Sequence, residues 1–101
     1  MEFIKLYKKV CETMSVFTYF VNDNAKYIIE TSISTHGTNI LLVAFIVNRK
    51  ENKVINSDSI LIDNDITYKE YKSKTNAFID KIKSLYNSAP ANDIIKEYKN
   101  Q

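Results

Sequence analysis

Hydrophobic positions recur along the chain with two different periods. In residues 1–15 the apolar side chains fall at three- and four-residue spacings, which predicts an amphipathic helix. Four later ranges are rich in β-branched and aromatic residues and predict strands: 16–22, 25–35, 38–48 and 53–62. Helical spacing returns over residues 66–86 and 91–99, which predicts a long helix and a short last helix. In the first helix the predicted apolar stripe is Phe3, Ile4, Tyr7, Val10, Cys11 and Met14.

Turn residues separate the predicted strands at short intervals. Asn22-Asp23-Asn24, His36-Gly37 and the polar loop 48–53 each favour a chain reversal, and Gly37 is the only glycine. Connections this short join antiparallel neighbours, because parallel neighbours need long crossovers. The sequence therefore predicts an α+β fold. Its order is a helix, a four-stranded antiparallel meander sheet in the order 1-2-3-4, and then one long and one short helix.

Length and composition indicate a single globular domain over residues 1–101, with 45% hydrophobic and 26% charged residues. The chain has one cysteine and no recognisable secretory leader, so we expect a reducing, cytoplasmic location. The longest apolar run, residues 40–47, is far shorter than the roughly twenty residues of a membrane-spanning helix. We therefore expect no membrane partner.

Two-residue alternation assigns the strand side chains to two faces of the predicted sheet. The face assigned to the long helix carries Tyr27, Ile29, Thr31, Ile33, Ile40, Leu42, Ala44, Ile46, Ile55, Ser57, Ser59 and Leu61. The opposite face is unexpectedly apolar and aromatic, and its candidate partner-binding residues are Phe17, Tyr19, Val43 and Phe45, with Glu30 and Asp58 at a polar border. Either a helix covers this second face as a third layer, or a partner protein or a second copy of the chain does, or the assumed strand register is wrong.

Residues that could carry chemistry are few. The one histidine, His36, falls in a predicted turn, and Cys11 falls on the apolar stripe of the first helix. Asp58, Asp63 and Asp65 form the densest acidic cluster, which helix capping explains without a metal. The chain contains no glycine-rich phosphate loop, no Gly-x-Ser-x-Gly, no His-Glu-x-x-His and no Cys-x-x-Cys. We therefore expect no catalytic site, no metal and no cofactor.

The charge balance weakly disfavours a nucleic-acid partner. The net charge is +2, and Arg49 is the only arginine among 14 basic residues. Arginine is the usual reader of guanine edges and phosphates. Even so, the predicted hairpin tip carries Arg49, Lys50 and Lys53, and a basic hairpin can enter a DNA groove. These three residues are the candidate nucleic-acid site of an alternative hypothesis, a DNA-binding accessory protein of a mobile element.

The sequence favours a small, non-enzymatic protein-binding module. Its 7 tyrosines and 5 phenylalanines are the side chains that anchor protein interfaces. The abundance of isoleucine, lysine, asparagine and tyrosine is typical of AT-rich genes, including those of phages, mobile elements and toxin–immunity loci. We therefore expect an inhibitor or immunity-type protein that neutralises a toxin or another enzyme by occlusion.

Overall fold

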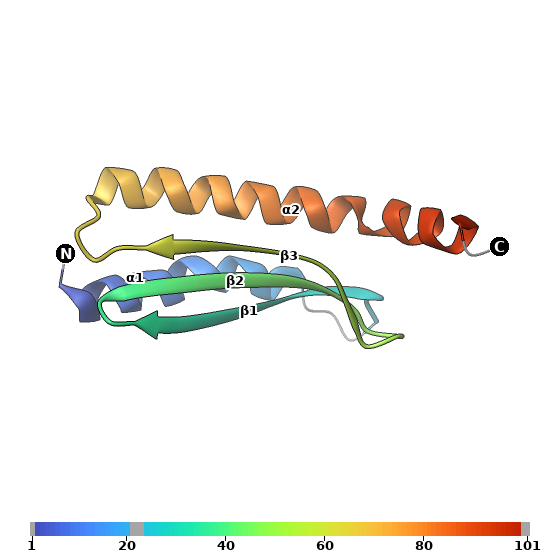
Figure 1. The fold of residues 1–101 in the computed structure, drawn as a ribbon, viewed down its shortest axis with the longest axis horizontal. Helices are drawn as coiled ribbons and strands as arrows, with labels where there is room; N and C mark the ends of the chain where they lie inside the picture. Colours follow the sequence, from blue (N-terminus) through green and yellow to red (C-terminus); the bar gives the residue numbers. More distant parts are fainter. Residues whose placement is uncertain (1, 21–23, 100–101) are drawn as a thin grey trace.

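The structure is a computed structural model that describes residues 2–20 and 24–99. Its elements are α1 (Phe3–Met14), the 3-10 helix η1 (Ser15–Phe20), β1 (Tyr27–His36), β2 (Asn39–Asn48), β3 (Lys53–Ile62) and α2 (Tyr68–Lys99). The strands form a three-stranded antiparallel sheet in the order β1-β2-β3. Figure 1 shows α2 running alongside β3, with α1 behind the strands. The class is α+β, as predicted.

The predicted four-stranded sheet is wrong, because Ser15–Phe20 forms η1 instead of a first strand. Residues 21 and 22 of that predicted strand lie outside the described residues. A strand would have placed Phe17 and Tyr19 on one face, whereas Phe17 is 2% exposed and Tyr19 is 86% exposed. The apolar contacts instead repeat every three residues, because Phe17 and Phe20 both pack inward. The Phe20 ring lies 4.8 Å from the Tyr86 ring, which joins η1 to α2.

The sheet is built from two hairpins. In the first, β1 pairs with β2 from Tyr27↔Asn48 to His36↔Asn39, and Gly37 adopts a φ of 62° in the turn. In the second, Ile46 pairs with Asn56 but Val47 pairs with Val54, so Ile55 is an extra residue at a β-bulge.

The bulge reverses the faces predicted for the rest of β3. With one extra residue in the strand, every later side chain points to the side opposite its predicted side. Ile60 and Ile62 therefore pair with Leu42 and Ile40 and share their face. Ser57, Ser59 and Leu61, which the sequence assigned to that face, lie on the other one.

The long helix begins and ends differently from the prediction. Thr67, rather than the Asp63–Asp65 segment, caps α2, because its Oγ1 accepts the backbone N–H of Glu70 at 3.2 Å. Asp63 instead stabilises the preceding turn, since its Oδ1 accepts the N–H of Asp65 at 3.1 Å. The predicted break at residues 87–90 is absent from the described chain, so the two predicted helices are one. Ala89, at that point, is buried in the core.

One hydrophobic core lies between the sheet and the helices. Its members come from one face of the sheet and from α1, η1 and α2: Leu6, Val10, Met14, Phe17, Tyr27, Ile29, Ile40, Leu42, Ala44, Ile46, Ile62, Tyr71, Phe78, Ile82 and Ala89. We call the sheet surface in this cluster the helix face. The two helices also contact each other, because the Thr13 and Tyr71 hydroxyls share a hydrogen bond of 2.8 Å. Both helices thus serve the same side of the sheet.

The buried stripe of α1 is rotated from the predicted one. Leu6, Val10 and Met14 are buried, whereas Ile4 is 67% exposed and Cys11 is also exposed. Sequence spacing alone allowed both stripes, since the apolar residues of this helix form one wide arc that contains both. Packing against Tyr71 and the sheet selects the stripe that contains Leu6.

Candidate protein-binding surface

The other side of the sheet, which we call the open face, carries a row of apolar residues along β2, each with a serine on at least one side. Leu41 lies between Ser34 and Leu61, and Val43 lies between Ser32 and Ser59. Phe45 lies between Glu30 and Ser57. Directly opposed side chains in a sheet lie close together. Because serine is short, Val43 and Phe45 project beyond the serines beside them. The result is an apolar ridge along the central strand.

This ridge lies outside the core. Leu41, Val43 and Phe45 are each half-buried, and none of them belongs to the core cluster or packs against it. Leu61, on the edge strand, is 48% exposed. Near the end of the ridge, Ile28 and Val47 are buried. The apolar surface of the open face therefore combines the half-buried Leu41, Val43 and Phe45 of β2 with the more exposed Leu61 and Val54 of β3, Val54 being 57% exposed.

The structure brings together part of the predicted partner-binding set. Val43, Phe45 and Glu30 lie on the open face, with Glu30 directly opposite Phe45. Phe17 lies in the core and is not available to a partner, and Tyr19 is exposed on η1 rather than on the sheet.

Asp58 lies on the helix face opposite Ala44, where its carboxylate is 3.3 Å from Lys81 Nζ. The bulge explains this placement, because it moves Asp58 to the helix side and Leu61 to the open face. Locating these two residues correctly needed the position of the bulge. No motif in the sequence marked it.

The β2–β3 hairpin tip carries the predicted basic residues. Arg49, Lys50 and Lys53 are all exposed. Asn48 at the base of the tip is fully buried, and its Oδ1 accepts the N–H groups of Lys50 and Glu51 at 3.1 and 3.3 Å. These bonds hold the tip in one shape. The basic side chains are therefore presented on an ordered turn.

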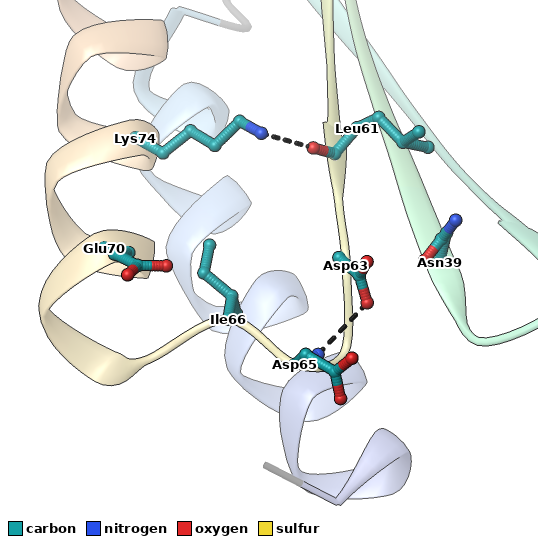
Figure 2. A pocket seen from close by; sticks show the side chains of 7 residues that line it. All are labelled: Asn39, Leu61, Asp63, Asp65, Ile66, Glu70 and Lys74. Atoms are coloured by element: carbon teal, nitrogen blue, oxygen red, sulfur yellow. Dashed lines mark hydrogen bonds between the residues drawn. The ribbon is translucent and has the colours of Figure 1, made fainter.

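A shallow hollow of about 530 Å³ lies where β3 passes into α2 (Figure 2). Asp63, Asp65 and Glu70 line it, and Lys74 Nζ donates to the Leu61 carbonyl at 2.6 Å. Asp63 is engaged in its own turn, as described above. Within residues 2–20 and 24–99, no group of three His, Cys, Asp or Glu side chains is placed to hold a metal ion. We interpret the hollow as the space left at the junction where β3 ends and α2 begins.

The remaining chemically distinctive groups lie apart. His36 ends β1 at the hairpin turn, and Cys11 is exposed on α1. Tyr71 is buried beneath α1, and this burial raises the pKa of its hydroxyl above 10.0, although the hydrogen bond with Thr13 opposes the shift. The raised pKa has a structural cause, the removal of the hydroxyl from water.

Comparisons of the chain with protein families, with curated proteins and with solved structures gave no match. In the part of the chain that the structure describes, no helix combines the length and the apolar character needed to cross a membrane. The open face and the hairpin tip are therefore the two candidate binding surfaces of this chain.

Proposed function

We propose that this chain is a small non-enzymatic protein-binding module that neutralises a partner protein by covering it with the open face, as an inhibitor or immunity protein does. The observation that carries the proposal is the half-buried ridge of Leu41, Val43 and Phe45 on a sheet face that the core does not include. Contiguous apolar surface of this kind commonly marks an interface in a small protein.

The arrangement of polar groups supports binding through this face. Interfaces combine an apolar centre with a polar rim, and Glu30, Ser32 and Ser34 provide such a rim along β1. Phe45 supplies a large anchor beside Glu30, whose carboxylate can select a basic or hydrogen-bonding partner group. Burying the ridge is favourable by roughly 25 cal/mol for each Å² of apolar area removed from water.

The placement of the reactive side chains also supports binding over catalysis. A catalytic site needs an acid, a base and an electrophile that converge in one pocket. His36 lies at the β1–β2 turn, Cys11 on α1 and Arg49 at the β2–β3 tip, so they belong to separate regions of the fold.

A charge placed on the ridge tests the proposal. Immobilised wild-type protein, Val43→Lys and the control Asn76→Lys are each incubated with lysate of the cells that encode the chain. Asn76 is exposed on α2, so the control adds the same charge away from the open face. We expect wild type and Asn76→Lys to retain a common protein that Val43→Lys loses. Retention by Val43→Lys at the wild-type level would rule out the open face as the binding surface.

The ordered basic tip favours a second candidate, a DNA-binding accessory protein. Arg49, Lys50 and Lys53 project from a turn held by Asn48, which suits insertion into a groove. In gel shifts over a salt series, Arg49→Ala with Lys50→Ala is expected to weaken DNA binding and to reduce the salt slope by about 2. Lys69→Ala with Lys72→Ala removes the same charge from exposed positions on α2 and serves as the control. A wild-type protein that shifts no DNA at low salt would eliminate this candidate.

A further inference from the structure

The outer edge of β1 exposes backbone groups in a regular order. In an antiparallel ladder, residues whose N–H and C=O both bond to the neighbouring strand alternate with residues whose groups point away. The N–H of Arg49 donates to the Lys26 carbonyl at 2.8 Å, so the even-numbered residues of β1 face β2. The odd-numbered residues therefore point outward. In agreement, the outward carbonyl of Tyr27 accepts a hydrogen bond of 3.0 Å from the Tyr86 hydroxyl.

Beyond Tyr27, this edge is unpaired in the described chain. Within residues 2–20 and 24–99, no hydrogen bond outside the β1–β2 ladder reaches the backbone of Ile29, Thr31, Ile33 or Thr35. The segment from Glu30 to Thr35 also lacks the lysine, proline or bulge that protects many strand edges.

The opposite edge of the sheet is partly occupied. On β3, Lys74 reaches from α2 to the outward Leu61 carbonyl, and α2 follows the strand (Figures 1 and 2). Ser57 of β3 is also engaged, because its N–H donates to Asn56 Oδ1 at 2.9 Å. No such bond reaches the outward groups from Ile29 to Thr35, so β1 is the more accessible edge for another strand.

Space is available beside β1. Thr31 and Thr35, whose side chains point to the helix side, are exposed, so neither α1 nor η1 overlies them. A hollow of about 330 Å³ lies between η1 and this edge and is lined by Thr18, Ile29 and Thr31, among others. A strand can therefore approach the edge in the plane of the sheet.

The sequence of the edge is symmetric about Ile33. Thr31-Ser32-Ile33-Ser34-Thr35 reads the same in both directions, and Glu30 and His36 flank it. If two such strands pair antiparallel about Ile33, each Thr31 lies opposite a Thr35 and each Ser32 opposite a Ser34. Each Glu30 then lies opposite the His36 of the other copy, so an acidic group meets a group that can carry positive charge.

The backbone directions fit this register. The centred pairing places odd-numbered residues opposite odd-numbered residues, and these are the residues whose N–H and C=O groups point outward. Ile33 meets Ile33, and Thr31 meets Thr35, as hydrogen-bonded pairs. A shift by one residue would bring inward-facing groups opposite outward-facing ones and would lose these bonds.

We propose that the chain forms a twofold-symmetric dimer in which the β1 strands of two copies pair antiparallel about Ile33. The dimer joins the two three-stranded sheets into one continuous sheet and places both open faces on the same side. It uses the backbone edge of β1, not the ridge on β2. It therefore goes beyond the proposed function and does not depend on it.

Paired charges at Thr31 and Thr35 test both the interface and its register. Thr31→Lys with Thr35→Lys places lysines opposite each other and is expected to give a monomer of 11.7 kDa, whereas wild type has twice that mass. Thr31→Lys with Thr35→Glu places opposite charges together in the same register and is expected to stay dimeric. Mass is measured by light scattering and sedimentation velocity over a concentration series, with circular dichroism to confirm folding.

A mixing experiment keeps the test decisive if one variant is weakly folded. Thr31→Glu with Thr35→Glu is expected to be monomeric alone and to form a heterodimer with the double-lysine variant. Val43→Lys, on the open face, is expected to leave the dimer intact. A monomeric wild type at every concentration would overturn the proposal. So would a dimer that survives in the double-lysine variant or that dissociates in Val43→Lys, because the contact would then lie elsewhere.

Discussion

The two faces of the sheet are built from neighbouring residues of the same strand but have different surroundings. In β2, Leu42 is fully buried beneath the helices, whereas Val43, the next residue, is only half-buried on the open face. Both faces of β2 are apolar, a pattern typical of strands covered on both sides. In the described chain the helices cover one side, and on the other side Ile28 and Val47 are buried while Leu41, Val43 and Phe45 are half-buried. On the helix face, burial of the apolar side chains of β2 stabilises the fold. On the open face, the apolar area that still contacts water could be buried by association.

The edges of the sheet differ in a similar way. Lys74 of α2 binds the outward Leu61 carbonyl of β3, and the outward groups of β1 beyond Tyr27 have no partner in residues 2–20 and 24–99. The described cover is thus concentrated on the helix face and the β3 edge. The open face and the β1 edge are less covered. They are the proposed partner-binding surface and the proposed dimer contact.

The largest expected contrast is between lysines at adjacent positions of β2. Leu42→Lys places an unpaired charge in the core, which is expected to cost several kcal/mol of stability. This is a large share of the total stability of a domain, which is roughly 5–15 kcal/mol. Val43→Lys can extend its charge into water and is expected to cost about 1 kcal/mol or less. Urea unfolding followed by circular dichroism measures both. Unfolding of Val43→Lys would mean that the open face is covered.

A second contrast compares phenylalanines on opposite sides of the sheet. Phe78, on α2, is 2% exposed, and Phe78→Ala is expected to cost about 3–5 kcal/mol because it leaves a cavity. Phe45, on the open face, is half-buried, and Phe45→Ala is expected to cost about 1 kcal/mol. Unfolding midpoints in urea give the two values. Equal losses would break the distinction between the faces.

The smallest effect concerns the buried hydroxyl of Tyr71 on the helix side. Because burial raises its pKa in the folded state, the neutral hydroxyl stabilises the fold fully below the unfolded pKa of about 10. This stability is lost as the pH rises from that value through the higher folded pKa. Tyr71→Phe is expected to be about 1 kcal/mol less stable at neutral pH, since it lacks the Thr13 hydrogen bond. It should then lose less stability than wild type in alkaline urea titrations. If the stabilities of wild type and Tyr71→Phe fell equally as the pH rises, ionisation of Tyr71 would not contribute to the alkaline loss of stability.

The first hairpin, the existence of the third strand and the first part of the long helix could be predicted from local patterns. The turn at Gly37 needs a positive φ, and the alternation in β1 and β2 assigns Ile29, Leu42 and Ile46 to the buried face that they occupy. Phe78 and Ile82 follow helical spacing and lie in the core. These features depend on residues near one another in sequence.

Two predictions were wrong because the apolar residues of one short segment fit two different arrangements. Phe17 and Tyr19 fit a strand, and Phe17 and Phe20 fit a 3-10 helix, so composition could not distinguish them. Contacts with distant residues did, because Phe20 packs against Tyr86. In the same way, α1 offered two apolar stripes, and contact with Tyr71 selected one.

The candidate surface combines both kinds of information. The pattern of residues along the strands shows that β2 is apolar on both sides, that Val43, Phe45 and Glu30 share a face and that the edge around Ile33 is symmetric. Contacts between distant segments determine which face the helices cover, bury Phe17 in the core and place Leu61 and Asp58 on their sides of the sheet. The physical reason is that alternation fixes only which side chains point the same way. One bulged residue at Ile55, and the packing of helices distant in sequence, decide which way is inward.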